Sequence, residues 1–378
     1  MIFYELMNLI MKNTFLVSLV LLFLISCSGQ TKQEDNLFQF NHVVEKDSKL
    51  SDLLDSVEFI PLETNDESLL PGLSKLLGMK DYIYASAETE ILKFDKRGSF
   101  VGKLSQLGNG PEDYLSINDY DIVSRNGNEE IWIAHQRGIS CYNAKDFSFL
   151  EQISLDVPVL HFKYVSDNAI VIQTSGEYSF YLCNKEGALR NAYLPNDPAN
   201  LSHSMMQFVD SDNGIFCILA GTDEAVHYND KQDNLELLRY VGGIDNVLTR
   251  SDNKDYMDKY GYLEYSQKVA RDFVNIVTFR QKAGNTMFFL RSGSGEKMLI
   301  NKRGSDEWES YDIYPTPSIE NDLLEGLNVR YFLSMASCNS DNSFIMSVPA
   351  VMIAGSSVNG KIVDEEDNPI VIKYQLKK

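Results

Sequence analysis

The chain has few basic residues, cysteines and histidines, and each shortage excludes a class of protein. Its 34 Lys and Arg stand against 54 Asp and Glu, so the formal charge at pH 7 is −20. Nucleic-acid binding needs an excess of Lys and Arg that neutralise phosphates, so we expect no nucleic-acid partner. Five cysteines in 378 residues are too few for a disulfide-stabilised scaffold.

Linear catalytic and metal-binding motifs are also missing. The five histidines lack HExxH or other metal-ligand spacing, and they are His42, His135, His161, His203 and His227. There is no GxSxG elbow, no phosphate-binding loop and no GxGxxG after a predicted strand. We therefore predict no cofactor and assign no catalytic residue. Hydrophobic residues make up 44% of the chain, which excludes overall disorder.

The first 30 residues carry an export signal. A short basic start at Met11 precedes an apolar run over 15–25, and small residues follow it, as in a secretory signal peptide over 1–26. The run is too short to be preferred as a membrane-spanning helix, although an uncleaved anchor is the alternative. We expect translation to start at Met11 rather than at Met1. The residues Leu24–Cys27 resemble a bacterial lipobox, which implies that Cys27 carries a lipid.

Residues 27–50 are predicted to be a lipidated, flexible tether. Ser28 follows the cysteine, and by resemblance this favours an outer-membrane location, on either the periplasmic or the cell-surface side. The remaining cysteines lack CxxC spacing and lie in predicted strands, so buried free thiols are expected at Cys141, Cys183, Cys217 and Cys338.

Six short apolar strands of one type recur along the rest of the chain. They are 82–86, 131–135, 170–174, 215–219, 287–291 and 344–348, and their first residues lie 49, 39, 45, 72 and 57 positions apart. Most follow a polar Asn, Asp or Gly turn, and each is followed by a further strand ending in a polar turn. Such turns favour strand–turn–strand units.

Two hairpins per repeat, at a period of about 40–50 residues, are typical of propeller blades. The fold class is therefore all-β, a six-bladed β-propeller of four-stranded blades over residues 51–378. The last blade lacks an outer strand, and Val57–Leu62 is predicted to supply it and close the ring. A β-sandwich pair is the alternative.

The long connections fall at one end of the predicted blades. Connections from strand 4 to the next strand 1, and from strand 2 to strand 3, contain nearly every elaboration, including a loop and short helical insertion at 244–271. In that insertion Tyr256, Tyr260 and Leu263 recur at helical spacing. Long loops on a rigid scaffold usually carry recognition, so we place the functional surface on this loop-rich face.

Carboxylates are abundant on the loop-rich face, and they include Glu63, Asp66, Glu67, Glu112, Asp113, Asp197, Glu320, Asp322, Glu325 and the run 364–367. A structural Ca²⁺ is one interpretation. A site that steers a basic partner is another, and a solvated surface is the third.

One loop motif resembles a known family. Gly108, Gly110, Pro111 and Tyr114 resemble the glycine–proline–tyrosine signature of the six-bladed propeller lipoproteins of Bacteroidota, which are NHL/TolB-like propellers. Residues around Asp322 and 367–377 are similar as well. The resemblance implies a cell-envelope propeller and no specific reaction. The glycines permit a sharp turn and Pro111 fixes φ, so a structural motif and a ligand loop both remain open.

The binding candidates are His135 and Arg137 at the mouth of the channel, with His203 on a neighbouring loop, Tyr114 and Asp322. A histidine at a strand end is more often structural, and the two tryptophans fit core packing better than sugar stacking. We predict a non-enzymatic cell-envelope lipoprotein that binds a glycan, a peptide or an envelope protein on its loop-rich face and the membrane through Cys27. The alternative is a propeller-type lyase or hydrolase that acts on a polymer at the channel mouth.

Overall fold

The computed structural model describes residues 37–125, 127–136, 138–197, 208–219, 221–324, 337–338 and 343–377. The predicted signal peptide, Cys27, Arg137 and His203 lie outside these residues. No helix in the described part of the chain is both long and apolar enough to span a membrane.

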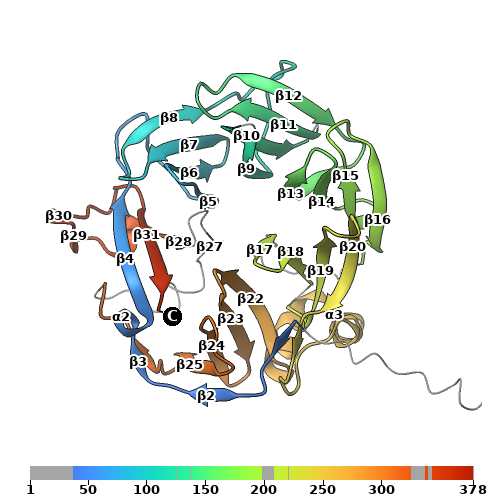
Figure 1. The fold of residues 1–378 in the computed structure, drawn as a ribbon, viewed down its shortest axis with the longest axis vertical. Helices are drawn as coiled ribbons and strands as arrows, with labels where there is room; N and C mark the ends of the chain where they lie inside the picture. The colour runs from blue at the N-terminus through green and yellow to red at the C-terminus, as the bar shows by residue number, and fades with distance from the viewer. Residues whose placement is uncertain are drawn as a thin grey trace, which may run out of the picture. The chain divides into compact units, whose positions relative to one another are not determined.

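Six antiparallel four-stranded units form a ring of blades, each running from an inner first strand to an outer fourth strand (Figure 1). Blade 1 comprises β5 (Lys75–Gly78), β6 (Tyr82–Ala87), β7 (Glu90–Asp95) and β8 (Phe100–Leu104). Blade 2 comprises β9 (Asp119–Arg125), β10 (Asn128–His135), β11 (Gly138–Asn143) and β12 (Phe149–Ser154). Blade 3 comprises β13 (Val159–Ser166), β14 (Ala169–Thr174), β15 (Tyr178–Cys183) and β16 (Leu189–Pro195).

The other three blades repeat this order. Blade 4 comprises β17 (Val209–Ser211), β18 (Gly214–Ile218), β19 (Glu224–Asn229) and β20 (Asn234–Arg239). Blade 5 comprises β22 (Asn275–Lys282), β23 (Asn285–Ser292), β24 (Gly295–Asn301) and β25 (Trp308–Tyr314). Blade 6 comprises β27 (Ser337–Cys338), β28 (Phe344–Val348), β31 (Ile370–Leu376) and β4 (Leu54–Pro61). The six-bladed propeller is confirmed, and the β-sandwich alternative is wrong.

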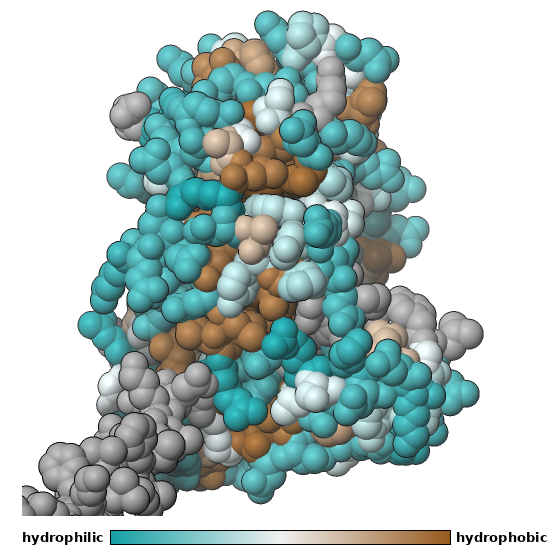
Figure 2. Space-filling view, turned by 90° about the vertical axis from the view of Figure 1, so that its right-hand side faces the viewer, coloured by the Kyte–Doolittle hydropathy of each residue, from teal (hydrophilic) through white to brown (hydrophobic). Residues whose placement is uncertain are grey.

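Each of the six recurrent strands in the sequence is the second strand of a blade. These strands are apolar because both of their faces are covered by neighbouring blades, and residues 130–135 of β10 are all buried. The core of the ring accordingly consists of six apolar clusters, one between each pair of adjacent blades, and a smaller seventh cluster includes Leu248, Tyr265 and Val269. The rim beside β16 and β20 is mainly hydrophilic, with smaller apolar areas between the hydrophilic residues (Figure 2).

The ring closes as the sequence predicts. Strand β4 pairs antiparallel with β31, from Ile370 opposite Pro61 to Leu376 opposite Leu54. Blade 1 packs tightly against this closure at Gly98. A Cβ on Gly98 would lie only 2.1 Å from the carbonyl oxygen of Pro61. Gly98 also has φ +89°, so this turn in blade 1 requires glycine.

The predicted tether needs a correction, because residues 38–49 form a strap on blades 4 to 6. In the strap, β1 (Phe38–Gln39) pairs with β21 (Val241–Gly242), β2 (Val43–Glu45) with β25, and β3 (Ser48–Lys49) with β26 (Ile319–Glu320). The short helix α2 (Leu50–Leu53) then leads into β4. Phe38 and Phe40 are buried in an aromatic cluster, which a flexible tether would leave in water.

Antiparallel order places the long connections at one end of the blades, as expected. The helix α3 (Arg250–Asp272) fills the connection from blade 4 to blade 5, and Thr249 and Asp252 form a capping box at its start. Gly261 interrupts the helix with φ 66°. In blade 6 the connection from strand 2 to strand 3 spans 349–369 and contains η2 (Ala350–Met352), β29 (Ser357–Val358) and β30 (Lys361–Ile362).

Candidate functional site

His135 lies inside blade 2. Its side chain is buried, with Nε2 2.8 Å from Oγ of Ser140 on the neighbouring strand. Burial at this depth does not fit the predicted role in ligand contact. The sequence placed His135 beside the channel mouth because it ends its strand, but the neighbouring strand β11 pairs with that end and the side chain is buried.

The glycine–proline–tyrosine loop is braced from within. The carboxylate of Asp113 accepts the Gly110 N–H at 2.7 Å, and a Cβ on Gly108 would lie 2.3 Å from that carboxylate. Tyr114 is fully buried, and its hydroxyl donates to the carbonyl oxygen of Thr89 at 2.9 Å. Burial raises the pKa of Tyr114. These contacts are those of a structural loop, and Pro111 belongs to the same turn.

Asp322 holds the start of α2. Its two carboxylate oxygens accept the Ser51 backbone N–H at 3.0 Å and the Ser51 hydroxyl at 2.5 Å. The Ser51 hydroxyl and N–H lower the pKa of Asp322. Tyr114 and Asp322 lie on connections with two whole blades between them, so the structure does not gather the predicted residues into one site.

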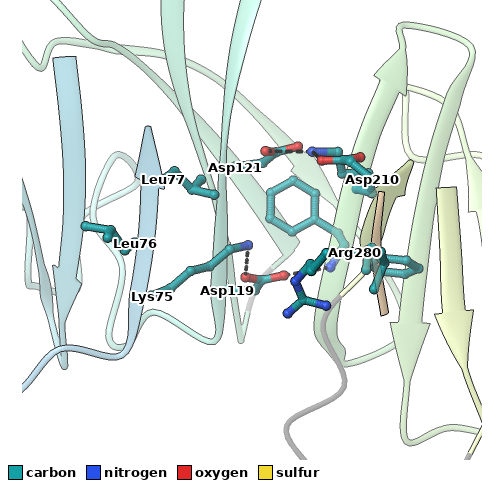
Figure 3. Close-up of a pocket in the computed structure, with 11 residues that line it drawn as sticks. Lys75, Leu76, Leu77, Asp119, Asp121, Asp210 and Arg280 are labelled. Carbon is teal, nitrogen blue, oxygen red and sulfur yellow. Dashed lines mark hydrogen bonds and ion pairs between the residues drawn. The ribbon is translucent and has the colours of Figure 1, made fainter. Parts of the chain in front are cut away.

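A charged cavity opens in the channel between the inner strands (Figure 3). It is lined by charged side chains from five blades, namely Lys75, Asp119, Asp121, Lys163, Asp210 and Arg280. In Figure 3, Lys75, Asp119 and Arg280 lie at one end of the cavity, and Asp121 and Asp210 lie at the other. The cavity has a volume of about 50 Å³ accessible to water, which is room for roughly three or four water molecules.

Ion pairs in this cavity join neighbouring blades. Lys75 Nζ of blade 1 lies 2.8 Å from Asp119 Oδ1 of blade 2, and His161 Nδ1 of blade 3 lies 3.6 Å from the other carboxylate oxygen. Burial raises the pKa of Asp119, but Lys75 and then His161 lower it further, so that it falls to about 2. Asp119 is therefore ionised in the folded chain at neutral pH.

A second set of pairs lies around Lys163 of blade 3. Its ammonium is 3.2 Å from Asp121 of blade 2 and 2.9 Å from Asp210 of blade 4. Burial raises the pKa of Asp121, which Lys163 only partly offsets. The sequence analysis did not identify these channel charges. Asp119 and Asp121 are two positions apart, as residues on one face of a strand are, and this spacing was their signal in the sequence.

The loops beside the ring closure form a second candidate site, which we call the seam loops and define as residues 62–74 and 349–369. Asn368 is buried between them and donates from Nδ2 to the carbonyl oxygens of Glu63 and Ser68, both at 2.7 Å. Its Oδ1 accepts the Leu70 N–H at 2.8 Å, and its own N–H donates to Thr64. One buried amide thus holds the two loops together.

The seam loops expose apolar side chains among carboxylates. The exposed fractions are 51% for Leu69, 65% for Val351, 45% for Met352 and 62% for Ile362. The loops also contain seven acidic residues, Glu63, Asp66, Glu67, Asp364, Glu365, Glu366 and Asp367, and one basic residue, Lys361. The sequence indicated the acidic run, but only the structure shows which apolar residues remain outside the core.

Other predicted residues are buried. Cys141, Cys183 and Cys217 are free and buried as expected, whereas the side chain of Cys338 lies outside the described residues. Trp132 and Trp308 are buried in the core. In the part of the chain that the structure describes, no group of three or more His, Cys, Asp or Glu is placed to hold a metal ion. A structural Ca²⁺, one interpretation of the acidic loops, stays a prediction.

The fold has relatives among solved structures from Bacteroides. A Bacteroides fragilis protein predicted to be exported is 15% identical, with a TM-score of 0.67, and the match covers 89% of this chain and 100% of that one. A member of the DUF4221 family from Bacteroides vulgatus is 10% identical, with a TM-score of 0.51 over 86% of this chain and 98% of that one. The predicted similarity in fold to propeller proteins of Bacteroidota is confirmed.

A search of curated proteins finds no match to the chain. One family model covers almost all of the propeller and the strap, over residues 36–375, and it is described as a domain of unknown function, DUF4934. The chain belongs to the DUF4934 family.

Proposed function

We propose that the chain is a cell-envelope lipoprotein whose propeller binds a partner on its loop-rich face without catalysis. The observation that carries this proposal is the position of the exposed apolar side chains. Among the described residues from Val43 onward, seven of the ten exposed large hydrophobic side chains belong to that face: Leu69, Leu107, Leu115, Tyr314, Val351, Met352 and Ile362.

Exposed apolar groups on ordered loops favour a binding role. Apolar surface left in water costs free energy, so a cluster of it on one face usually marks an interaction site. The propeller beneath is rigid, because each blade packs against its neighbours through an apolar cluster. A rigid scaffold that presents ordered loops loses little entropy on binding.

The cell-envelope location depends on the N-terminal sequence. The signal-like segment over 1–26 and the lipobox-like residues before Cys27 support export and lipidation. The similarity in fold to a Bacteroides fragilis protein predicted to be exported agrees with this location. Labelling cells with a radioactive fatty acid tests the anchor: the chain should incorporate label, and Cys27→Ser should lose it and leave the membrane fraction.

A thermal-shift titration of the mature chain tests the binding role. Glycans, peptides and envelope proteins are added separately, and a ligand of the folded state raises Tm with its concentration. The strap must be kept, because a chain that begins at residue 51 lacks Phe38 and Phe40. The proposal predicts a shift with one class, which weakens when Met352 and Ile362 are replaced by polar residues. No shift with any class would contradict it.

The channel cavity favours the catalytic alternative, a lyase or hydrolase acting on a polymer. Asp119, Lys75 and His161 come from three blades and could move protons together. The cavity is small for a sugar ring, so a polymer would have to react at its mouth. Turnover of an envelope or dietary polysaccharide that is lost in His161→Gln would support catalysis. Unchanged turnover in that variant would exclude this site.

A further inference from the structure

We infer that the seam loops dock a basic protein segment that carries apolar side chains. This inference rests on the proposed binding function and names the class of partner. It depends on three features of residues 62–74 and 349–369: an ordered shape, exposed aliphatic groups and a large excess of carboxylates.

The ordered shape comes from buried contacts. Within 349–369 the backbone N–H of Gly355 donates to the carbonyl oxygen of Val363, and the N–H of Val363 donates to that of Ser356. Three side chains of this segment, Ile353, Val358 and Val363, are buried in the core shared by blades 5 and 6. The exposed side chains therefore project from a folded unit, and a partner would meet a surface that is already formed.

The apolar groups fit a protein better than a glycan. Val351, Met352, Ile362 and Leu69 are aliphatic or thioether side chains, which pack against Leu-like or aromatic residues. Sugar rings are usually bound by stacking on flat aromatic side chains. Both tryptophans of the chain are buried, and no exposed aromatic side chain is found among the described seam residues.

The charge selects a basic partner. Seven carboxylates and one lysine give the seam loops a formal charge of −6, and that lysine, Lys361, already lies 3.5 Å from Asp367. Glu67, Glu365 and Glu366 are exposed on the same two loops as the apolar groups. A second copy of this chain would bring the same negative charge, and the whole chain carries −20, so a basic protein segment is the better complement.

Peptide binding to the full mature chain tests the inference. The probe is a fluorescent peptide of alternating lysine and leucine, compared with versions in which glutamine or glutamate replaces every lysine. Wild type should bind the lysine peptide about tenfold more tightly than the glutamine version at low salt. About 0.5 M salt should remove most of that difference, because exposed charges are screened.

Two sets of substitutions locate the binding. Val351→Ser/Met352→Ser/Ile362→Thr and Glu67→Gln/Glu365→Gln/Glu366→Gln should each weaken the lysine peptide by about tenfold. The matched controls are Val101→Thr/Leu150→Ser, on the exposed outer strands β8 and β12, and Asp81→Asn/Glu186→Gln/Asp230→Asn, in turns at the opposite end of the blades. These controls should bind as wild type does.

The outcomes separate this inference from the proposed function. An equal loss of affinity for the lysine peptide in the seam variants and the controls would overturn the inference. Equal binding of all three peptides to wild type would overturn it as well. Binding of a glycan that the seam variants lose would overturn it and leave the proposed function in place. Self-association of the chain through the seam loops, seen as a dimer in sedimentation, would overturn it in favour of a second copy. No binding of any of the three peptides would overturn the inference and leave the proposed function in place, because that function also covers glycans and envelope proteins.

Discussion

The side-chain amide of Asn368 donates a hydrogen bond of 2.7 Å to the carbonyl oxygen of Ser68, 300 positions earlier in the chain. This bond joins the loop before β31 to the loop after β4, where the two ends of the propeller meet. Both residues are fully buried or nearly so.

Asn368→Ala should destabilise the fold by about 2–4 kcal/mol, because it leaves buried backbone groups without partners. Chemical denaturation measures the loss. Asn359→Gly is the control, because the exposed Asn359 side chain donates to Phe59 alone among the described residues and its φ of 51° suits glycine. It should cost about 1 kcal/mol or less. An equal loss in both variants would contradict the role assigned to Asn368.

The strap should stabilise blades 4 and 5. The Phe38 ring centroid lies 5.2 Å from that of Phe288, and the Phe40 centroid lies 4.5 Å from that of Trp308. Phe38→Ala or Phe40→Ala should each lower the free energy of unfolding by about 3–5 kcal/mol. Val43→Ala in the same strap changes an exposed side chain and should have little effect. If all three behave alike in denaturation, residues 38–49 are a tether after all.

The Lys75–Asp119 pair should make the free energy of unfolding depend on pH in the acid range. The folded pKa of Asp119 is about 2 against an ordinary 3.8, so the ionised carboxylate stabilises the fold above pH 3.8. That contribution, about 2 kcal/mol, is lost as the pH falls from about 4 towards 2. The difference in unfolding free energy between wild type and Asp119→Asn should therefore shrink over this range. A constant difference from pH 6 to pH 2.5 would show that the pair contributes nothing.

The Tyr114 hydroxyl should support the glycine–proline–tyrosine loop. Tyr114→Phe removes the donor to the carbonyl oxygens of Thr89 and Leu104, and it should cost about 1–2 kcal/mol of stability. Tyr314→Phe changes an exposed tyrosine and should leave Tm unchanged. A ligand role would instead leave the stability of Tyr114→Phe near wild type and reduce binding.

The propeller was predictable because its signal is repeated. Each second strand is buried on both faces, so it shows as an apolar run beside a polar turn, and the unpaired last blade pointed to Val57–Leu62 as its outer strand. The strap was missed because Phe38 and Phe40 stand among polar residues, and their burial depends on blades 4 and 5, some 200 residues away.

The candidate site was harder to predict. Composition marked the acidic run at 364–367, but exposure of Val351, Met352 and Ile362 depends on how their loop folds over blade 6. His135 was chosen from its position at a strand end, and the neighbouring strand covers it. The inter-blade pairs of Asp119 and Asp121 depend on the spacing of three blades around the channel.

Site-specific photo-crosslinking in the cells that make the chain tests the binding role of the seam loops most directly. A photoreactive phenylalanine replaces Met352 in one variant and Leu150 in another, because both side chains are about equally exposed, at 45% and 44%. The account predicts an adduct from position 352, with a protein whose contact surface is basic, and none from position 150. Equal adducts from both positions, or an adduct from position 150 alone, would contradict it.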